Sequence, residues 1–297
     1  MRGMRKAAGP EGERGMILVN VLLFVAIASG IVMLMITAED GALQRATRLS
    51  EAAHAQAAAN GGELSAIVAL RRDGLVAFDT DNSREPWAAL AERAAPIKGG
   101  SFDLAIADAQ GRFNVNLLMK DDPAALQLFG RIGSALGIQP ELIAQAITHI
   151  RLSGPISDLG PLSGAAALKP ELLARLSGLV TALPRDRDTK INVNSVSEDL
   201  LGIMLDNPVA AHGLIELRKR RGWLTQADFD AQQAPLPPIA GFTSDIYWVR
   251  SRVTIGDTSR QLTSLLVRQR DAQGVTVRPV ARWRGVAVPA QAPPLPF

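Results

Sequence analysis

An uncharged, apolar run near the amino terminus is the most distinct pattern along the chain. It covers residues 16–38, and its polar members are Asn20, Ser29 and Thr37. An α-helix rises about 1.5 Å per residue, so this run would extend about 35 Å as a helix, more than the roughly 30 Å of a bilayer's hydrocarbon core. The pattern therefore predicts a membrane-spanning helix.

Beyond this run, apolar residues recur at three- and four-residue spacing among charged ones. Leu43, Ala46 and Leu49 begin this series, which continues to about Asn60. Such spacing is typical of a helix with one apolar face. We predict one long helix that leaves the membrane and ends near Asn60, and a shorter helix over residues 63–72. A helix that packs against a sheet and a helix that extends into solvent beyond a membrane anchor would both produce this pattern.

Alternating apolar and polar positions predict strands in two separate parts of the chain. The first part comprises residues 101–106, a turn, and a short second strand that reaches Phe113. The second part begins at Ile246 and has the pattern of an antiparallel meander, in which turns separate three strands. Four prolines mark the tail, residues 288–297, which we expect to be extended and unpacked.

Helical patterns fill the long interval between the two β regions. Proline or a capping residue marks most of the expected starts, because proline suits the first helical turn and Ser or Thr with an acid three residues later forms a capping box. The expected helices are residues 123–136, 140–151, 170–179, 197–205, 209–221 and 225–233. The strands should thus flank a helical part that interrupts them in sequence.

A short asparagine motif occurs twice at the margins of these helices. The two copies are Phe113-Asn114-Val115-Asn116 and Ile191-Asn192-Val193-Asn194, and each precedes a helix start. Asparagine side chains bond to nearby main-chain groups and hold tight turns. We therefore predict that these four asparagines have a structural role rather than a ligand-binding one.

Composition and charge exclude several classes of function. The net charge of +3 owes much to residues 1–15, which hold four basic and two acidic groups. The remainder is close to neutral and offers little attraction for nucleic acid. The chain has no cysteine, hence no disulfide and no thiolate metal site.

The sequence also contains no recognisable catalytic motif. The three histidines, His54, His149 and His212, lack metal-ligand spacing. No nucleophile elbow, Walker loop or dinucleotide fingerprint stands in a suitable context. We expect that the protein is not an enzyme.

The apolar run opens with a recognisable junction, Arg14-Gly15-Met16. Followed at once by an apolar helix, this junction resembles the class III leader of type IV pilins and type II secretion pseudopilins. The resemblance implies that prepilin peptidase cuts after Gly15 and methylates the new amino terminus, Met16. A removable secretory signal would need a shorter apolar stretch of about 7 to 15 residues. A plain, uncleaved anchor is the remaining alternative.

The fifth residue of the predicted mature chain departs from the common pilin pattern. Most pilins carry Glu there, whereas this chain has Asn20. In that family the Glu pairs with the amino terminus of the subunit assembled just above, because a carboxylate inside the bilayer is costly unless paired. A subunit with nothing above it has no such partner. By this resemblance Asn20 marks a tip subunit.

Three further segments sharpen the resemblance. They are Gly111-Arg112-Phe113-Asn114-Val115-Asn116 after Asp108, Ile191-Asn192-Val193-Asn194, and Ser244-Asp245-Ile246-Tyr247-Trp248. In this order they resemble blocks of type II secretion system protein K, the large minor pseudopilin. The resemblance implies an α+β, pilin-like fold: a long N-terminal helix packed on an antiparallel sheet, with a large inserted all-α domain.

The resemblance also implies a function, partners and a location. The chain would be a minor pseudopilin that caps the tip of the periplasmic pseudopilus and supports protein export across the outer membrane. Its partners would be two smaller minor pseudopilins, the major pseudopilin and prepilin peptidase, with secreted substrates as further candidates and no nucleic acid. It would cross the bacterial inner membrane once, with most of the chain in the periplasm.

The expected domain division follows the same pattern. It comprises a class III leader (1–15), a transmembrane part of the N-terminal helix (16–38), the first part of a pilin-like domain (39–113), the inserted α-helical domain (114–241), the completion of the sheet (242–287) and the proline-rich tail (288–297).

Calcium is one point at which the chain departs from the family pattern. Some family members bind calcium in the helical domain, and the corresponding acidic loop is absent from this sequence near residues 148–154. Calcium prefers six to eight oxygen ligands. We predict that Asp121 with Asp122, and Asp186 with Asp188, form solvated turns or helix starts. We therefore expect no cofactor and no metal.

A second family competes for part of the chain. Residues 191–229 also resemble the helix-hairpin-helix modules of competence proteins, which bind DNA phosphates through glycine-rich hairpins. The corresponding turn here is Asp206-Asn207-Pro208, which adds an acid and removes one N–H donor. We predict a shared fold with lost function. The alternative function is that of a membrane-anchored DNA-binding protein of an uptake system.

Overall fold

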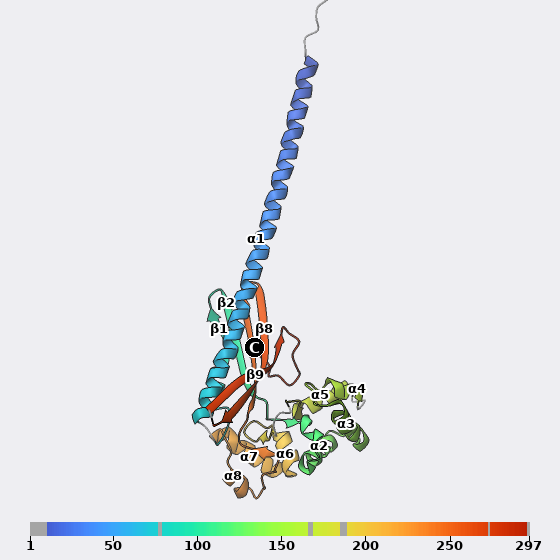
Figure 1. The fold of residues 1–297 in the computed structure, drawn as a ribbon, viewed down its shortest axis with the longest axis vertical. Coiled ribbons are helices and arrows are strands. Elements are labelled where there is room, and N and C mark those ends of the chain that lie inside the picture. The colour runs from blue at the N-terminus through green and yellow to red at the C-terminus, as the bar shows by residue number, and fades with distance from the viewer. Residues whose placement is uncertain (1–10, 77–78, 166–168, 185–188, 273, 296–297) are drawn as a thin grey trace, which may run out of the picture. The chain divides into compact units, whose positions relative to one another are not determined.

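The computed structural model describes residues 11–76, 79–165, 169–184, 189–272 and 274–295 (Figure 1). The chain divides into two compact units, Met1–Ala53 and His54–Phe297, and each is described by itself. The first unit is the amino-terminal part of helix α1, Glu11–Val76. The second unit contains the rest of α1, a five-stranded sheet and a group of helices.

Helix α1 runs without a break through Asn60-Gly61-Gly62. The helix end that we predicted near Asn60 is therefore wrong, and residues 63–72 belong to the same helix. Ala59 and Ala66, on either side of the glycines, are fully buried. Gly62 permits close packing, because a Cβ there would lie 2.8 Å from Cζ of Phe102. Burial against the sheet thus outweighs the cost of glycine in a helix, about 1 kcal/mol each.

The sheet is antiparallel throughout and has the strand order β1-β2-β7-β8-β9. Its strands are β1 (Glu92–Ile97), β2 (Gly100–Asp108), β7 (Ile246–Ile255), β8 (Thr258–Asp271) and β9 (Gly274–Arg284). The two β regions predicted from the sequence are thereby confirmed and joined. Because Asp108 pairs with Tyr247, the chain leaves the sheet and returns to it at the same point.

The carboxyl-terminal part of α1 packs on this sheet through small and aliphatic side chains. Ala55 and Ala59 contact Val253 and Leu262 in one cluster. Ala66 and Leu70 belong to another, with Leu104, Tyr247 and Leu266. Polar contacts add to this packing: Glu63 accepts hydrogen bonds from Ser264 and from the guanidinium of Arg282. The predicted arrangement of a long helix on an antiparallel sheet is confirmed.

The interval between β2 and β7 is helical, and its helices surround a core of their own (Figure 1). It contains η2 (Val115–Met119), α2 (Pro123–Ala135), α3 (Pro140–Ser153), α4 (Gly160–Ala165), α5 (Pro170–Leu179), α6 (Glu198–Leu205), α7 (Pro208–Arg221) and α8 (Gln226–Ala231). All six predicted helices are present, and the prolines occupy the first turn as expected. The short helices η1 (Ala88–Leu90) and α4 were not predicted.

Two pairs of very short parallel strands lie among these helices. Strand β3 (Phe113–Asn114) pairs with β4 (Val180–Thr181), and β5 (Ile191–Asn192) pairs with β6 (Ala240–Gly241). The strand that we predicted up to Phe113 therefore exists, but it does not extend the main sheet. Each pair joins the first and last segments of one half of the helical part.

The carboxyl-terminal tail differs from its prediction. We expected it to be unpacked, yet Gln291 and Leu295 are buried. The main-chain oxygens of Gln291 and Pro293 accept hydrogen bonds from Arg112 and Arg250, respectively. Prolines lack the N–H that strand pairing needs, so the tail is held instead by its carbonyl groups and side chains.

Candidate functional site

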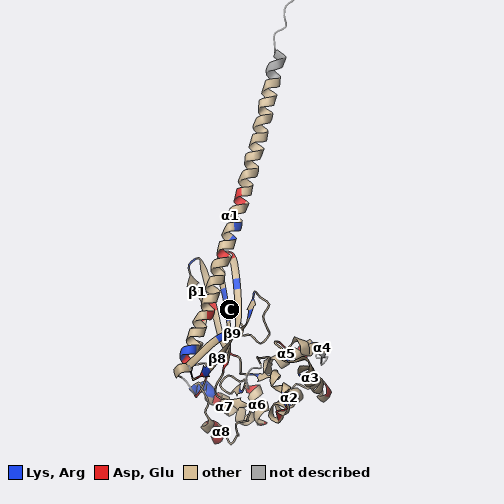
Figure 2. Ribbon diagram, in the orientation of Figure 1, with Lys and Arg blue, Asp and Glu red and all other residues tan. Residues whose placement is uncertain are grey.

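The apolar part of α1 is the first candidate functional element. Figure 2 shows a long uncharged stretch of this helix, which in the sequence covers residues 16–38 and ends before Glu39 and Asp40. Its large side chains are exposed, with Phe24 and Leu34 each 71% accessible. Among the described residues, α1 is the one helix that is both long enough and apolar enough to cross a membrane. It fits the predicted single-pass anchor in the inner membrane.

The predicted processing site lies at the start of this helix. Residues 1–10 of the predicted leader lie outside the described residues. The helical backbone of α1 includes the junction between Gly15 and Met16, and the side chains of Met16 and Asn20 are exposed. Cleavage after Gly15, methylation of Met16 and the significance of Asn20 stay predictions.

The first asparagine motif closes the first half of the helical part. Asn114 Oδ1 accepts hydrogen bonds from the N–H groups of Asn116 (3.2 Å) and Leu183 (3.1 Å), and its amide donates to Oγ1 of Thr189 at 3.1 Å. Asn116 accepts from the N–H of Ile156 at 3.0 Å and donates to that residue's carbonyl at 2.9 Å. Both asparagines are buried and tie distant loops together.

The second motif repeats this arrangement and reaches further. Asn192 Oδ1 accepts from the N–H of Asn194 at 2.9 Å, and Asn194 Oδ1 accepts from the N–H of Leu224 at 2.7 Å. The amide of Asn192 also donates to Oδ2 of Asp108 at 2.7 Å and to the main-chain oxygen of Asp81 at 2.9 Å. The second motif therefore connects the helical part to the end of β2 and to the loop after α1.

Gly111 and Arg112, just before the first motif, and Phe113, its first residue, also lie where the helical part meets the sheet. Gly111 is buried in the turn after β2. Arg112 Nη1 donates to the main-chain oxygen of Gln291 at 3.0 Å. Phe113 is fully buried and stacks on Phe129, with ring centroids 5.9 Å apart. The motif residues named from the sequence are thus brought together around the place where the chain leaves the sheet.

Asp108 is the acceptor on which three segments converge. Its Oδ2 accepts from Ser195 Oγ and Ser244 Oγ, each at 2.6 Å, and from the amide of Asn192. Its Oδ1 accepts from the N–H of Gln110 at 2.7 Å. Burial raises the pKa of Asp108, and the hydrogen bonds from Ser195 and Ser244 oppose that rise. One carboxylate thus joins β2, the second motif and the segment that re-enters the sheet.

A buried ion-pair network lies beside this junction. Arg268, on β8, donates to Asp73 Oδ2 at 2.8 Å and to Asp81 Oδ1 at 2.5 Å. The hydroxyl of Tyr247 donates to the same Asp81 oxygen at 2.6 Å, and the guanidinium lies 5.1 Å from the centroid of the tyrosine ring. Burial raises the pKa of Asp73, although the charge of Arg268 acts in the opposite direction. We call Asp73, Asp81, Tyr247 and Arg268 the arginine network.

The sequence analysis missed several of these residues. Asp81 and Arg268 were not singled out, although an arginine directly after the apolar segment Leu265-Leu266-Val267 was a signal of a buried charge. Gln110 was assigned only to a turn. Its side chain in fact accepts from the N–H groups of Asp245 and Ile246 and donates to the carbonyl of Lys190. Gln110 therefore connects the segment that leaves the sheet after β2 to the segment that re-enters it at β7.

The described residues include one group of three acids close enough to share a metal ion, Asp73, Asp81 and Glu85. This group does not fit calcium well, because the guanidinium of Arg268 already lies against two of the three carboxylates and calcium prefers six to eight oxygens. Asp122 caps α2, as predicted. Asp186 and Asp188 lie outside the described residues. The residues described give no support to a calcium centre.

The possible DNA-binding hairpin is formed by α6 and α7. Its turn carries Asp206 in the left-handed conformation, with φ of 52°. Asn207 caps α7 by accepting from the N–H of Ala210 at 3.0 Å. At the end of α7, Lys219 pairs with Glu216 and Arg221 pairs with Asp228. These ion pairs lower the positive charge that could attract DNA phosphates. The turn also places the carboxylate of Asp206 where such a module would bind phosphate.

Comparisons with known proteins bear on the whole chain. No protein-family model matches it. It is 28% identical over 320 aligned residues to type II secretion system protein K of Pseudomonas aeruginosa, with 93% of this chain and 94% of that protein covered. The chain is similar to type II secretion system protein K over nearly its whole length. The resemblance seen in its motifs is thereby confirmed.

A solved structure supports the fold of this chain. The crystal structure of the GspK–GspI–GspJ complex from the type 2 secretion system of enterotoxigenic Escherichia coli contains a chain that matches with a TM-score of 0.66. The two chains are 22% identical, and the match covers 82% of this chain and all of the other. The pilin-like fold with a helical insertion, which we predicted from the resemblance to protein K, is confirmed.

Proposed function

We propose that this chain is a minor pseudopilin that caps the tip of the type II secretion pseudopilus and supports protein export across the outer membrane. The observation that carries the proposal is helix α1, whose first part is apolar and exposed and whose last part packs on a pilin-like sheet. The chain is also similar to protein K over 93% of its length. We infer a mechanical role without catalysis, with the chain anchored in the inner membrane and most of it in the periplasm.

The anchor would act in two stages. Prepilin peptidase would remove residues 1–15 and methylate Met16, and the apolar part of α1 would then pack with the corresponding helices of other subunits. A missing Glu at position 20 suits a subunit that has no neighbour above it. The exposed leucines of α1, among them Leu43 and Leu49, continue the contact surface beyond the membrane.

The helical insertion would give the tip its bulk. Residues 114–241 would form a domain inserted between 39–113 and 242–287, and the proline-rich tail would follow the last part. The insertion has its own core, and the polar junction around Asp108 fixes it to the sheet. Such a rigid attachment supports a capping role, because a loosely tethered domain would not block the addition of another subunit.

Two smaller minor pseudopilins are the best-supported partners, because the matching structure is a complex that contains GspI and GspJ. The test is to co-express the full chain with these two subunits and isolate it from detergent-solubilised membranes. We expect a three-component complex. Leu49→Glu, on α1, should weaken it, whereas the control Leu152→Glu, on α3 and also exposed (83%), should not. A chain that remains alone would overturn the proposal.

DNA binding is the competing function, and the α6–α7 hairpin is its only support. A gel-shift assay of the full chain with double-stranded DNA, at two salt concentrations, distinguishes the two functions. We expect no shift. Tight binding that weakens steeply with salt, as phosphate contacts require, would favour the uptake-system alternative.

A further inference from the structure

A small polar cavity of about 350 Å³ lies at the junction between the sheet and the helical insertion. Two arginines line it: Arg112, from the first motif segment, and Arg218, on α7. Ser195, Ser197 and Trp248 contribute to its wall. Neither the anchor nor the capping role makes use of these groups. We call this space the junction cavity.

Neither arginine of the junction cavity has an acidic partner among the described residues. Arg112 Nη1 donates to the main-chain oxygen of Gln291 at 3.0 Å, and Arg218 Nη1 donates to that of Val193 at 2.7 Å. A guanidinium carries five N–H donors, so most donors of both groups are uncommitted within the described structure. Both side chains are half-buried, and this burial lowers the pKa of both arginines.

One carboxylate, that of Asp108, also lines the junction cavity. Its hydrogen bonds come from Ser195, Ser244, Asn192 and Gln110. None comes from Arg112 or Arg218. If Asp108 is ionised, the two arginines leave the cavity with a surplus of one positive charge. A single negative charge would balance this surplus.

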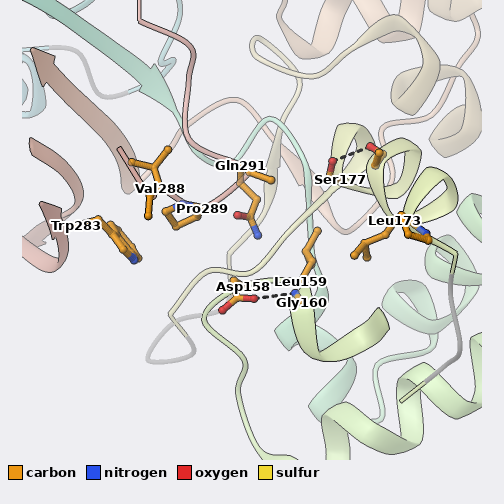
Figure 3. Close-up of a pocket in the computed structure, with 13 residues that line it drawn as sticks. Asp158, Leu159, Gly160, Leu173, Ser177, Trp283, Val288, Pro289 and Gln291 are labelled. Carbon is orange, nitrogen blue, oxygen red and sulfur yellow. Dashed lines mark hydrogen bonds between the residues drawn. The ribbon is translucent and has the colours of Figure 1, made fainter. Parts of the chain in front are cut away.

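Gln291 supplies a further uncommitted polar group. It is only 3% exposed, and neither Oε1 nor Nε2 of its carboxamide has a hydrogen-bond partner in the described structure. The residue forms part of the wall of the junction cavity and of a neighbouring cavity of about 580 Å³. Figure 3 shows its carboxamide in that larger, mostly apolar space, near Asp158 and Leu159. A buried amide without a partner is costly.

We propose that the junction cavity is a binding site for a carboxylate group, held by Arg112 and Arg218. The planar fork of a guanidinium matches the two oxygens of a carboxylate, and an anion would supply the countercharge that neither arginine has among the described residues. The carboxylate could belong to a free small acid or to an acidic side chain of another polypeptide. Because the cavity lies where the insertion joins the sheet, its occupation would strengthen that attachment.

The test uses the purified full chain in detergent and three probes at constant ionic strength: acetate, the blocked amino acid N-acetylglutamate amide, and inorganic phosphate. Calorimetry and the thermal unfolding midpoint report binding. We expect saturable binding of a carboxylate probe and a rise in the midpoint, since a ligand that binds only the folded state stabilises it. Tighter binding of the blocked glutamate would indicate a protein side chain, and equal binding of acetate a small free acid.

Arginine variants locate the site. Arg112→Gln or Arg218→Gln should weaken carboxylate binding by about tenfold or more, as loss of a charge-assisted pair predicts, whereas the exposed control Arg220→Gln should bind as the unaltered chain does. Arg112→Lys and Arg218→Lys keep the charge and should retain part of the affinity, which separates loss of binding from loss of folding. Absence of carboxylate binding, tighter binding of phosphate, or unchanged binding in both Arg→Gln variants would each overturn the proposal.

Discussion

Gly111 lies against Ser195 so closely that a Cβ added to the glycine would be 2.5 Å from the serine carbonyl oxygen. Gly111 lies in the turn after β2 and Ser195 directly follows the second asparagine motif, so this contact packs the exit from the sheet against the second half of the helical insertion. The obstacle is a main-chain atom, which cannot rotate out of the way as a side chain can. Only glycine therefore fits at position 111.

Gly111→Ala should accordingly destabilise the fold. Overpacking of this kind costs about 1–3 kcal/mol, and we expect a loss of that size in the free energy of unfolding, measured by denaturant titration of the full chain in detergent. The matched control is Gly130→Ala in α2, where no atom lies within 4 Å of the added Cβ; it should be neutral or stabilise by up to about 1 kcal/mol. Equal effects of both substitutions would contradict this account of the contact.

Asn192→Asp tests the polar junction without changing its shape. The substitution exchanges the amide that donates to Asp108 Oδ2 at 2.7 Å for a second carboxylate. Two buried acids would then face each other, and we expect a loss of about 3–5 kcal/mol at neutral pH, part of which acid would restore as the acids are protonated. Asn60→Asp, at an exposed site on α1, is the control. A loss below 1 kcal/mol, measured by the same denaturant titration, would show that the junction is not held by this contact.

Arg268→Gln tests the arginine network. The substitution leaves Asp73 and Asp81, which are 7% and 2% exposed, without their cation. Removal of one partner of a buried ion pair typically costs about 3–5 kcal/mol, so a loss of this size is expected in thermal or chemical unfolding. Arg260→Gln, an exposed position on the same strand, should change stability little. If Arg268→Gln were neutral, the network would contribute nothing to the attachment of α1.

Glu85 should make stability depend on pH. Burial raises its pKa to about 7 from 4.5, with Asp73 and Asp81 adding to the rise and the bond from Trp87 opposing it. The folded state thus holds a proton that the unfolded state loses, so stability contributed by the neutral acid is present below about pH 4.5 and is lost as pH rises through 7.

Glu85→Gln should remove this dependence. The variant is neutral at every pH but keeps one acceptor oxygen in place of the two that accept from Trp87 and Asn82, so its thermal midpoint should rise relative to that of the unaltered chain between pH 4.5 and pH 8. Asp73 and Asp81 interact with Glu85, so the quantity to follow is how the difference in midpoint between the two proteins changes with pH. The control is Glu92→Gln, at an exposed position of β1. A Glu85→Gln advantage that does not shrink toward acid would refute the assignment.

The extent to which the sequence predicted this fold depended on how local each signal was. Helix starts were predicted well because proline at the first turn, the N-cap at Ser197 and the capping box of Thr225 with Asp228 are local chemistry. Strand β1 was missed because it is an edge strand with Pro96 and an irregularity between Glu92 and Ala95, so it lacks alternation. The break expected near Asn60 was wrong because burial on the sheet overrides the local preference of glycine.

The candidate site divides in the same way. The asparagine motifs were visible because their members are adjacent and repeat, although their distant partners were not. The pair between Arg268 and Asp81 joins positions 187 residues apart, and nothing in the sequence around either one indicates the other. Such contacts follow from the topology. Because β7 pairs with both β2 and β8, Arg268 on β8 is brought close to the loop after α1, which holds Asp81.

Processing before Met16 is open to a direct test in a host that contains prepilin peptidase. Gly15→Leu should block cleavage, because the resemblance to pilins places the cut after this glycine, and mass spectrometry of the membrane fraction should then detect a peptide that spans positions 15 and 16. Gly30→Leu, in the same apolar helix and with no atom within 4 Å of the added Cβ, should be cut as the unaltered chain is. An intact spanning peptide in the unaltered chain would favour a plain membrane anchor instead.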